Sequence, residues 1–393
     1  MARDARMTPA IPPLLKSLNE RTVLEAIRAG APISRAEISR RAGISKPTVS
    51  LALQSLVEVG LAREVDHDPD GPSYGAVFFE PVHEAALVLG LDIGARFVRG
   101  AVCDLAGTVR ARQDVELSSA SAEAVLDAIV RLRRSLVESL HLPDAQIDCA
   151  VVGLPGVVDA AGGTLHLSHF YSLENRPLGR ELHERLQLPV VLENDVNLAA
   201  LGEQWQGVAR GVDDFVFLSV GTGLGAGLVL GGELHRGRHG AAGELDYALV
   251  GLELDVDPCA DGVATLAARF YAESEGRSTL APPFDARDVF AAARGGDRWA
   301  QSVVAEVARR IVIHIWPLGA VADVGLVVLG GGIGANGDLL LEPVRELLAV
   351  WLPYPPRVEI SSLGEAAVLT GALAVGLRSA LDNVFAQRRP ATM

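Results

Sequence analysis

The chain has 393 residues, 49% of them of apolar type, and a formal net charge of −14. This length is enough for two or three domains, and the apolar fraction can fill a large core. A uniformly basic nucleic-acid-binding protein is excluded. No run reaches the roughly 18 consecutive apolar residues of a membrane span, and no apolar segment of a signal peptide follows the first basic residues. We therefore expect a cytoplasmic protein that does not enter a membrane.

The charge is unevenly distributed along the chain. Residues 1–65 carry ten Lys or Arg and six Asp or Glu, a net charge of +4, which leaves −18 for the remaining residues. An acidic body repels DNA, so any contact with DNA is expected in the first segment alone. The three cysteines, Cys103, Cys149 and Cys259, are far apart and predict neither a disulfide framework nor a zinc cluster.

The first part of the chain predicts two helices in succession. The apolar spacing favours a helix over residues 18–29, which Gly30 ends. Ser34 and Glu37 then have the spacing of a capping box, in which each side chain satisfies a backbone N–H group of the other residue. The second helix is expected to end at Gly43.

A third helix follows after a short turn. Ser45 can cap it, and Pro47 is tolerated in the first turn because its nitrogen needs no intrahelical acceptor. An apolar stripe comes next, formed by Val49, Leu53, Leu56 and Val57. Two capped helices joined by a glycine turn, in a basic segment, favour a DNA-binding helix-turn-helix. The alternatives are a helical bundle that packs on another protein and a dimerisation module.

The polar start of the third helix is the expected reading edge, because hydroxyl and ammonium groups suit phosphates and base edges. Residues 62–65 and 76–79 are strand-like and flank an acidic, turn-rich tip, residues 66–75, which predicts a wing with weak affinity for DNA. The expected DNA contacts are Arg35, Arg40, Arg41, Ser45, Lys46, Thr48 and Ser50.

The rest of the chain contains an internal near-repeat. Residues 88–109 and 215–234 each show an apolar run, a glycine turn, an alternating run and a second turn. Helical stretches are expected over 122–140 and 196–205, with a strand over 190–193. Two such meanders predict an α/β fold with two related lobes that face a cleft.

Two glycine-rich turns fall in this body. Gly221–Gly227 exposes backbone N–H groups without a Cβ atom in the way and is a candidate anion cradle. A second run, residues 326–334, predicts a strand that enters a glycine turn before a helix from Asp338. Each alone is explained by a tight turn, but together they indicate a nucleotide-binding ancestor.

Two polar segments are candidate ligand contacts. Glu193-Asn-Asp-Val-Asn197 lies at a strand end that opens a helix, where loops point into clefts. Asp195 there can act as a general base toward a hydroxyl, with Asn194 as donor and acceptor; the alternative is a simple helix N-cap. In Gly240-Ala-Ala-Gly-Glu244, the Glu244 carboxylate can accept hydrogen bonds from sugar hydroxyls, or be an ordinary surface carboxylate.

On these motifs the chain resembles the ROK family of repressors, open reading frames and kinases, and most of all its branch with an N-terminal winged helix-turn-helix. The resemblance covers about residues 18–377 and includes Pro155–Asp159 and Asn175–Leu178. It implies an actin-like, sugar-kinase-type α/β body. The domains expected are a winged head (1–82), a first lobe (83–200, completed by a C-terminal helix at about 364–380) and a second lobe (201–363). It also implies that Asp195 matches the catalytic base of the kinases and that Asn194 and Glu244 contact the sugar.

The chain departs from the kinases of this family at the phosphate turn. Asp92 and Gly94 remain, but Ala95, Arg96 and Phe97 replace the second Gly, the Thr and the Lys. Phosphoryl transfer depends on positioned donors and cations around the transferred group. We therefore do not expect ATP as a cofactor or kinase activity, although Gly221, Thr222 and Gly223 persist as remnants of a second phosphate turn.

The residues that match the family's zinc site also differ. Tyr247 occupies the position of a His ligand that also contacts the sugar, and Cys259 alone remains of a cysteine run. Because zinc sites of this type need four N or S ligands, no zinc is expected. His169 stands where the family often has a sugar-binding Asn, so His169 and Tyr247 are expected to reshape the effector pocket.

These observations predict a sugar-responsive transcriptional regulator, a repressor, that binds an inverted repeat in double-stranded DNA as a homodimer or homotetramer. The effector would bind in the interlobe cleft without being phosphorylated. The alternatives are an active ATP-dependent sugar kinase with a DNA-binding head, and a regulator that has lost ligand control.

Overall fold

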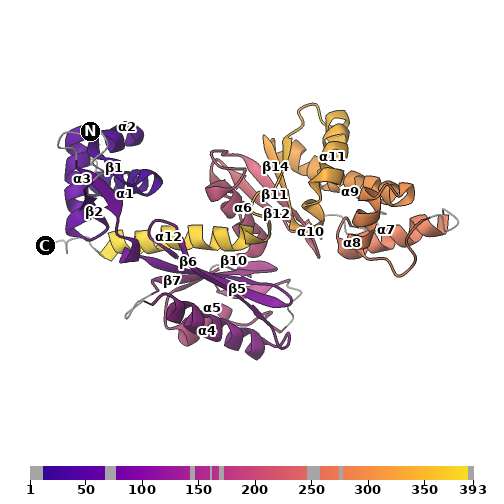
Figure 1. The fold of residues 1–393 in the computed structure, drawn as a ribbon, viewed down its shortest axis with the longest axis horizontal. Helices are drawn as coiled ribbons and strands as arrows, with labels where there is room; N and C mark the ends of the chain where they lie inside the picture. The colour runs from indigo at the N-terminus through magenta and orange to yellow at the C-terminus, as the bar shows by residue number, and fades with distance from the viewer. Residues whose placement is uncertain are drawn as a thin grey trace, which may run out of the picture.

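The computed structural model describes residues 12–66, 77–141, 147–159, 162–167, 172–245, 257–273 and 278–387. Its three parts are a small head rich in helices and two lobes, each built on a five-stranded sheet. Figure 1 shows the head at one end of the molecule, with the long C-terminal helix α12 (Ala367–Gln387) running from the meeting point of the lobes to the head. The architecture is the two-lobed α/β body with a winged head that the sequence predicts.

The head contains three helices and a three-stranded antiparallel sheet of order β1-β3-β2. Its elements are α1 (Pro12–Gly30), β1 (Ile33–Ser34), α2 (Arg35–Ala42), α3 (Lys46–Glu58), β2 (Ala62–Val65) and β3 (Phe78–Pro81). Helix α1 begins six residues before the predicted start, because prolines at positions 12 and 13 are compatible with a first helical turn. The second wing strand begins two residues later than predicted, and the wing tip, residues 67–76, lies outside the described residues.

The predicted caps of the head helices are present. The hydroxyl of Ser34 accepts the N–H of Glu37 at 3.3 Å, and Gly43 ends α2 in the left-handed conformation with φ +65°. The hydroxyl of Ser45 accepts the N–H of Thr48 at 3.4 Å. The capping box is one-sided, because the Glu37 carboxylate pairs with arginines of its own helix.

The predicted apolar stripe of α3 is correct for three of its four residues. Val49, Leu53 and Leu56 are buried, but Val57 is 37% exposed and Ala52 is buried in its place. The period of 3.6 residues carries Ala52 and Val49 onto the same face and turns Val57 toward its edge.

The first lobe has the strand order β10-β7-β4-β5-β6, in which β4, β7 and β10 are parallel. Its strands are β4 (Leu87–Ile93), β5 (Phe97–Asp104), β6 (Val109–Glu116), β7 (Cys149–Leu154) and β10 (Val190–Asn194), with a small hairpin of β8 (Val157–Asp159) and β9 (Thr164–His166). Helices α4 (Ala122–Ser139) and α5 (Leu178–Leu186) cover one face, and α12 covers the other. A short helix, η1 (His83–Ala85), connects the head to this lobe.

The second lobe repeats this arrangement, which confirms the internal near-repeat. Its order is β13-β12-β11-β14-β15, with β11, β14 and β15 parallel. The strands are β11 (Phe215–Val220), β12 (Leu224–Leu230), β13 (Glu233–Leu234), β14 (Leu326–Gly330) and β15 (Arg357–Ile360). Helix α6 (Asp195–Gln206) covers one face. The other face carries α7 (Ala260–Glu273), α8 (Ala286–Arg294), α9 (Arg298–Ala322), α10 (Gly331–Gly334) and α11 (Gly337–Trp351).

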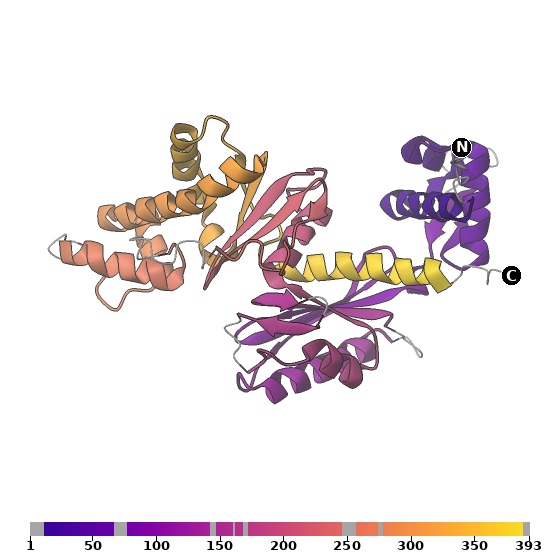
Figure 2. The same ribbon diagram turned by 180° about the vertical axis from the view of Figure 1, so that it is seen from behind.

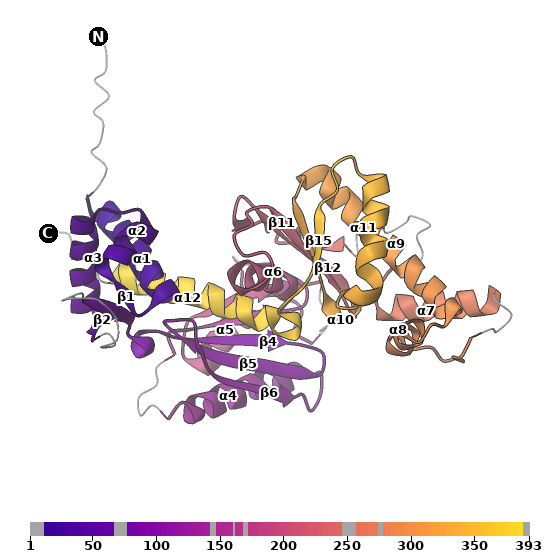
Figure 3. The same ribbon diagram turned by 45° about the horizontal axis from the view of Figure 1, so that its top comes forward.

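Helix α12 (Ala367–Gln387) follows η3 (Gly364–Ala366) and extends seven residues beyond the predicted end. It packs on β4 and β7 of the first lobe and on α6, and its last turns join the core of the head. Figure 2 shows it from behind, lying between the first sheet and α6, and Figure 3 shows its end reaching the head helices. The sequence placed this helix within one lobe and missed its contact with the head.

The crossing of α6 and α12 is unusually close. A Cβ atom at Gly371 would lie 1.8 Å from the carbonyl oxygen of Leu198, and one at Gly202 would lie 2.3 Å from that of Ala367. Glycine at both positions therefore lets the two backbones touch. The expected lobe boundary at residue 200 falls inside α6, which packs on both lobes.

One helix among the described residues, Gly364–Phe385, is long and apolar enough to cross a membrane by length and composition. Its apolar residues face β4, β7 and α6, so the packing within the protein accounts for its composition.

Candidate effector cleft and DNA interface

The polar residues of the first lobe gather at one edge of its sheet. Strands β4, β7 and β10 are parallel, so Asp92, Gly156 and Asn194 follow or end neighbouring strands at the same edge. This edge of a parallel sheet is where α/β proteins bind ligands. The sequence-predicted residues Asp92, Asn194 and Asp195 are therefore brought together.

Asn194 has the N-cap role that the sequence allowed as the alternative, and its amide also bonds to the turn after β7. Its Oδ1 accepts the N–H of Asn197 at 2.9 Å, so it caps α6, and its Nδ2 donates to the carbonyl of Gly156 at 3.0 Å. The cap positions the start of α6, and the second bond fixes the turn after β7. A ligand that bonds to Asn194 is thus in direct contact with the start of α6.

Asp195 is the first residue of α6, and its Oδ1 accepts the N–H of Val196 at 2.9 Å. Burial, together with the neighbouring charges of Asp92 and Glu244, raises the pKa of this carboxyl to about 7, although its backbone hydrogen bonds oppose the rise. Near neutral pH the group can therefore either accept a proton or a hydrogen bond from a hydroxyl, or donate one.

Glu244 reaches this neighbourhood because its loop lies directly on β12. The N–H of Ala226 donates to the carbonyl of Gly243 at 2.8 Å, and a Cβ atom at Gly243 would lie 1.8 Å from the carbonyl oxygen of Ala226. Gly243 also has φ +91°, a value that favours glycine. The loop brings the Glu244 carboxylate close enough to Asp195 to influence its pKa.

Three residues that the sequence did not propose as contacts hold the start of α6 in place. The buried Glu193 carboxylate accepts the N–H of Asn194 and the Nδ2 of Asn197, both at 3.0 Å, and the Nε of Arg236 at 2.7 Å. Glu193 and Asn197 lie in the motif that signalled the site. Arg236 is distant in sequence, and nothing in the sequence pairs it with Glu193.

The phosphate turn of the first lobe is tight and already paired. The N–H of Gly94 donates to the carbonyl of Phe97 at 2.9 Å, and Arg99 donates to the Asp92 carboxylate at 3.3 Å. Burial raises the pKa of Asp92, and the charge and hydrogen bond of Arg99 oppose that rise. Arg96 is 3.4 Å from Glu116 on β6 and lies over the ring of Phe97, while the sequence did not single out Arg99.

The glycine turns of the second lobe meet each other. A Cβ atom at Gly221 would lie 3.5 Å from the nitrogen of Gly332, and the N–H of Gly221 donates to the carbonyl of Gly223 at 3.0 Å. Thr222 is exposed between them. Gly227 serves packing instead, because its Cβ would lie 2.7 Å from that of Ala200 in α6. Only the first part of the predicted anion cradle is therefore open toward a ligand.

Two predicted effector contacts, His169 and Tyr247, lie outside the described residues. Cys259 is buried, and its N–H donates to the Asp257 carboxylate at 2.7 Å. Among the residues that the structure describes, no three His, Cys, Asp or Glu side chains are grouped to hold a metal ion. The absence of zinc stays a prediction, because residues 246–256 before Cys259 lie outside the described residues.

The predicted DNA contacts lie on the exposed side of α2 and α3. Lys46 and Arg35 are exposed, whereas Arg40 and Arg41 both pair with Glu37, Arg41 at 2.8 Å. The hydroxyls of Ser45 and Thr48 lie 2.8 Å apart, and that of Ser50 donates to the carbonyl of Lys46. Most of these side chains already have a partner in the head, so a DNA duplex would have to replace that partner to bind them.

The outward face of α3 continues beyond the predicted edge. Leu51 is 70% exposed, and Gln54, also exposed, donates to Glu58 at 2.9 Å. They lie one and two turns beyond Pro47 on the same face. An amide can bond bidentately to adenine and an apolar group can contact a thymine methyl, so both residues extend the candidate reading edge.

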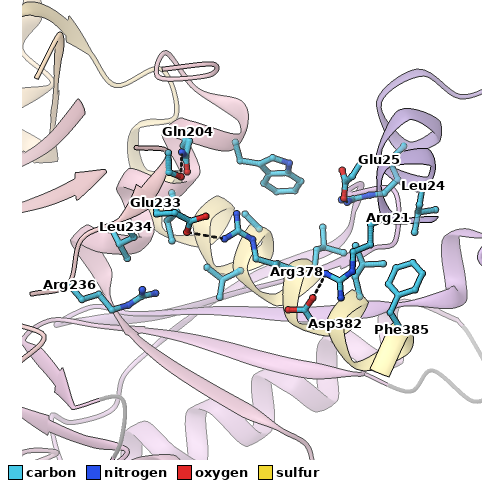
Figure 4. Close-up of a pocket in the computed structure, with 18 residues that line it drawn as sticks. Arg21, Leu24, Glu25, Gln204, Glu233, Leu234, Arg236, Arg378, Asp382 and Phe385 are labelled. Atoms are coloured by element: carbon cyan, nitrogen blue, oxygen red, sulfur yellow. Dashed lines mark hydrogen bonds and ion pairs between the residues drawn. The ribbon is translucent and has the colours of Figure 1, made fainter. Parts of the chain in front are cut away.

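A groove of about 650 Å³ separates the head from the second lobe, and α12 forms its floor; we call it the junction groove. Figure 4 shows Arg21, Leu24 and Glu25 of α1 on one side, and Gln204 and Glu233 on the other. Arg21 is ion-paired with Asp382 and lies 5.1 Å from the ring centre of Phe385, so the head contacts α12 directly. Arg236, the partner of Glu193, also lines the groove.

Comparison with known proteins places these features in one family. The ROK family matches residues 88–378, and the MarR family matches residues 17–71. A protein named as a xylose repressor of Caldicellulosiruptor bescii is 26% identical over 392 residues, covering 94% of this chain and 98% of its own length. A glucokinase of Thermotoga maritima is 36% identical over 243 residues, covering 56% of this chain and 74% of its own.

Two solved structures extend the comparison. A ROK family transcriptional regulator described as a homologue of the E. coli Mlc protein has a TM-score of 0.78 at 22% identity, and the match covers 95% of this chain and 98% of that one. A ROK glucokinase from Streptomyces griseus, in complex with glucose and AMPPNP, has a TM-score of 0.63 at 27% identity over 75% of this chain and all of its own. From the match to the body, the chain belongs to the ROK family, with a winged head of MarR type.

Proposed function

We infer that the protein is a sugar-responsive DNA-binding transcriptional regulator, and specifically a repressor. The observation that carries this inference is an unbroken path of packing from the cleft to the head. Helix α6 begins with Asp195 and crosses α12 where Gly202 and Gly371 let the two backbones touch. Near its other end, α12 contacts the head through the ion pair of Asp382 and Arg21. A change at the start of α6 is thereby transmitted to the head.

The effector acts by binding two states of this path differently, since a ligand shifts an equilibrium only through differential affinity. Asn194, Asp195 and Glu244 offer an amide and two carboxylates to sugar hydroxyls. When the effector binds, the hydrogen bonds of Asn194 and the start of α6 shift together. Helix α12 moves with α6, and the head moves with α12 through the ion pair of Arg21 and Asp382. The junction groove leaves the head room to turn relative to the second lobe.

We propose a neutral sugar as the effector, with xylose as the first to test, because relatives that span nearly the whole chain are named xylose repressors. The head offers one reading helix per chain, so we propose a homodimer, or a homotetramer built from it, that places two α3 helices on an inverted repeat. We propose a cytoplasmic location, and activity without zinc or ATP.

The test is fluorescence anisotropy of the full chain with the DNA upstream of its own gene and an unrelated duplex of equal length, at several salt concentrations. We expect a specific complex that weakens when the effector is added. A parallel thermal-shift series with xylose, other pentoses, hexoses, N-acetylhexosamines and sugar phosphates identifies the effector. Equal affinity for both duplexes would contradict the proposal, and specific binding with no sugar response would leave a regulator without ligand control.

An ATP-dependent sugar kinase with a DNA-binding head is the second candidate. Asp195 favours it, because a carboxyl with a pKa of about 7 suits a general base near neutral pH. A coupled assay with ATP, magnesium and the same sugars separates the two functions. Turnover that Asp195→Ala abolishes would establish the kinase, and absence of turnover with every sugar that stabilises the protein would reject it.

A further inference from the structure

Arg99 lies in β5 at the base of the effector cleft and has a role that the proposed function does not use. Its guanidinium is 3.3 Å from Asp92, 3.7 Å from Asp114 and 3.6 Å from Glu365. The side chain is 23% exposed, and that of Asp92 is 9% exposed. One cation therefore serves three carboxylates from three different elements, β4, β6 and η3.

The guanidinium also lies over the β4–β5 turn. Its NH1 atom is 3.8 Å from the position that a Cβ atom would take at Gly94. A nucleotide-bound magnesium ion needs free carboxylate oxygens and room for phosphate at such a turn. Here the carboxylate is paired, and the guanidinium stands beside the glycine where the phosphate would approach. The residues present do not fit magnesium and a nucleotide.

We propose that Arg99 is the resident counter-ion of the effector cleft, taking the place of a divalent cation at Asp92 so that the cleft holds its sugar without a nucleotide. This deepens the proposed function, on which it rests for the identity of the ligand. The charges around the cleft support the role. The charges of Asp92 and Glu244 raise the pKa of Asp195, and Asp92 has Arg99 as its ion-pair partner.

Glu365 gives Arg99 a second connection. It lies in η3, directly before α12, so the same guanidinium links the sheet edge to the start of the helix that reaches the head. Asp92 and Glu365 compete for the Arg99 guanidinium. A sugar that forms a hydrogen bond with Asp92 weakens its ion pair with Arg99 and so strengthens the ion pair of Arg99 with Glu365. Arg99 is therefore a positioning residue for α12 as well as a counter-ion.

The test is the response of the full chain to magnesium. Arg99→Met keeps the approximate length of the side chain and removes its charge, so Asp92 and Glu365 lose this cation and can take up another. We expect the Tm of this variant to rise by roughly 2 °C or more in millimolar MgCl2, relative to NaCl of equal ionic strength. Wild type should not respond, and the double variant Asp92→Asn/Arg99→Met should lose the response.

Arg112→Met is the matched control, because Arg112 approaches Asp114 at 3.9 Å but is not paired with Asp92. It should remain insensitive to magnesium. An Arg99→Met protein that ignores magnesium, or a wild type stabilised as strongly as the variant, would overturn the proposal.

A measurement on the wild type covers the case in which Arg99→Met does not fold. Electron paramagnetic resonance of Mn²⁺, with and without AMPPNP, should show no stoichiometric binding to wild-type protein. Binding that Asp92→Asn abolishes would overturn the proposal. Neither readout uses DNA or sugar, so failure here is separate from failure of the proposed function, which only the anisotropy and thermal-shift series test.

Discussion

The two ends of α12 differ in how they are held. In the body, its backbone touches that of α6 at Gly371, and a Cβ atom at Gly376 would lie 2.1 Å from Val88 on β4. At the head, side chains make the contact beside an open groove: the exposed ion pair of Arg21 and Asp382, and apolar packing of Leu381 and Phe385 in the core of the head. Backbone contact permits one geometry, while side-chain packing and an exposed pair tolerate several. The body end therefore sets the position of α12, and in the proposed function the head end is where the orientation of α12 affects DNA binding.

The largest combined effect, on stability and on the sugar response, is expected from separating the two helices in the body. In an open helix Gly→Ala stabilises by about 1 kcal/mol, but at Gly371 the new Cβ would lie 1.8 Å from a backbone oxygen. We expect Gly371→Ala to lower the free energy of unfolding by about 3 kcal/mol, as measured by urea denaturation, and to abolish the effect of sugar on DNA affinity.

Gly325→Ala is the control, because nothing lies within 4 Å of a Cβ atom there. It should change stability little and leave the sugar response intact. Equal stability of the two variants would show that α6 and α12 can move apart at little cost. The body end of α12 would then be no more rigidly packed than the head end.

Protonation of Asp195 gives the next effect. Its folded pKa of about 7 lies above the usual 3.8, so the folded state binds the proton more tightly, and wild type loses stability as pH rises from about 4 to about 7. Asp195→Asn lacks this loss and keeps an acceptor for the N–H of Val196. We expect equal Tm values near pH 4 and an advantage of ~4 kcal/mol in the free energy of unfolding for the variant near pH 8, from thermal unfolding across pH. A constant difference between the proteins would mean that Asp195 is ionised throughout.

Much of this arrangement was predictable because it depends on local sequence. The caps at Ser34 and Ser45, the glycine stop at Gly43 and the two meanders each need only a few neighbouring residues. The polar edge was also predictable, since Asn194 and Asp195 follow an apolar strand directly. These features arise from backbone hydrogen bonding and side-chain periodicity, which a single segment contains.

The long-range pairings were not predictable. Arg99 with Glu365, Arg236 with Glu193 and Arg21 with Asp382 join residues that are hundreds or tens of positions apart, and a surface arginine has the same appearance in sequence as a buried bridging one. Helix α12 was underestimated for a related reason. Its apolar residues continue past the first lobe because they also pack on the head, whose position the sequence does not contain.

Substitutions at the head end of α12 should change stability less, but they should clearly change the effect of sugar on DNA affinity. Exposed ion pairs contribute about 0.2–1 kcal/mol, so we expect Asp382→Asn to alter the Tm little. The DNA affinities with and without sugar should nevertheless move closer together, because the head is less firmly tied to α12. The charge exchange Arg21→Asp/Asp382→Arg should restore the difference. An unchanged sugar effect in Asp382→Asn would assign the coupling to the apolar contact with Phe385.

The smallest change is expected at a single phosphate contact in the head. Lys46 is exposed at the start of α3. We expect Lys46→Ala to lower the slope of log K against log salt by ~1 and to weaken binding to all duplexes alike.

Gln54→Ala should act on sequence preference instead. It should keep the salt dependence and change the preference among operator variants by about 1–3 kcal/mol at one base pair. Anisotropy titrations with single-base operator variants, from ~50 to ~200 mM salt, separate the two effects. If Lys46→Ala left both affinity and salt dependence unchanged, α3 would not meet the backbone at its first turn. The head would then contact DNA through another face, and α12 would control the orientation of that face instead of α3.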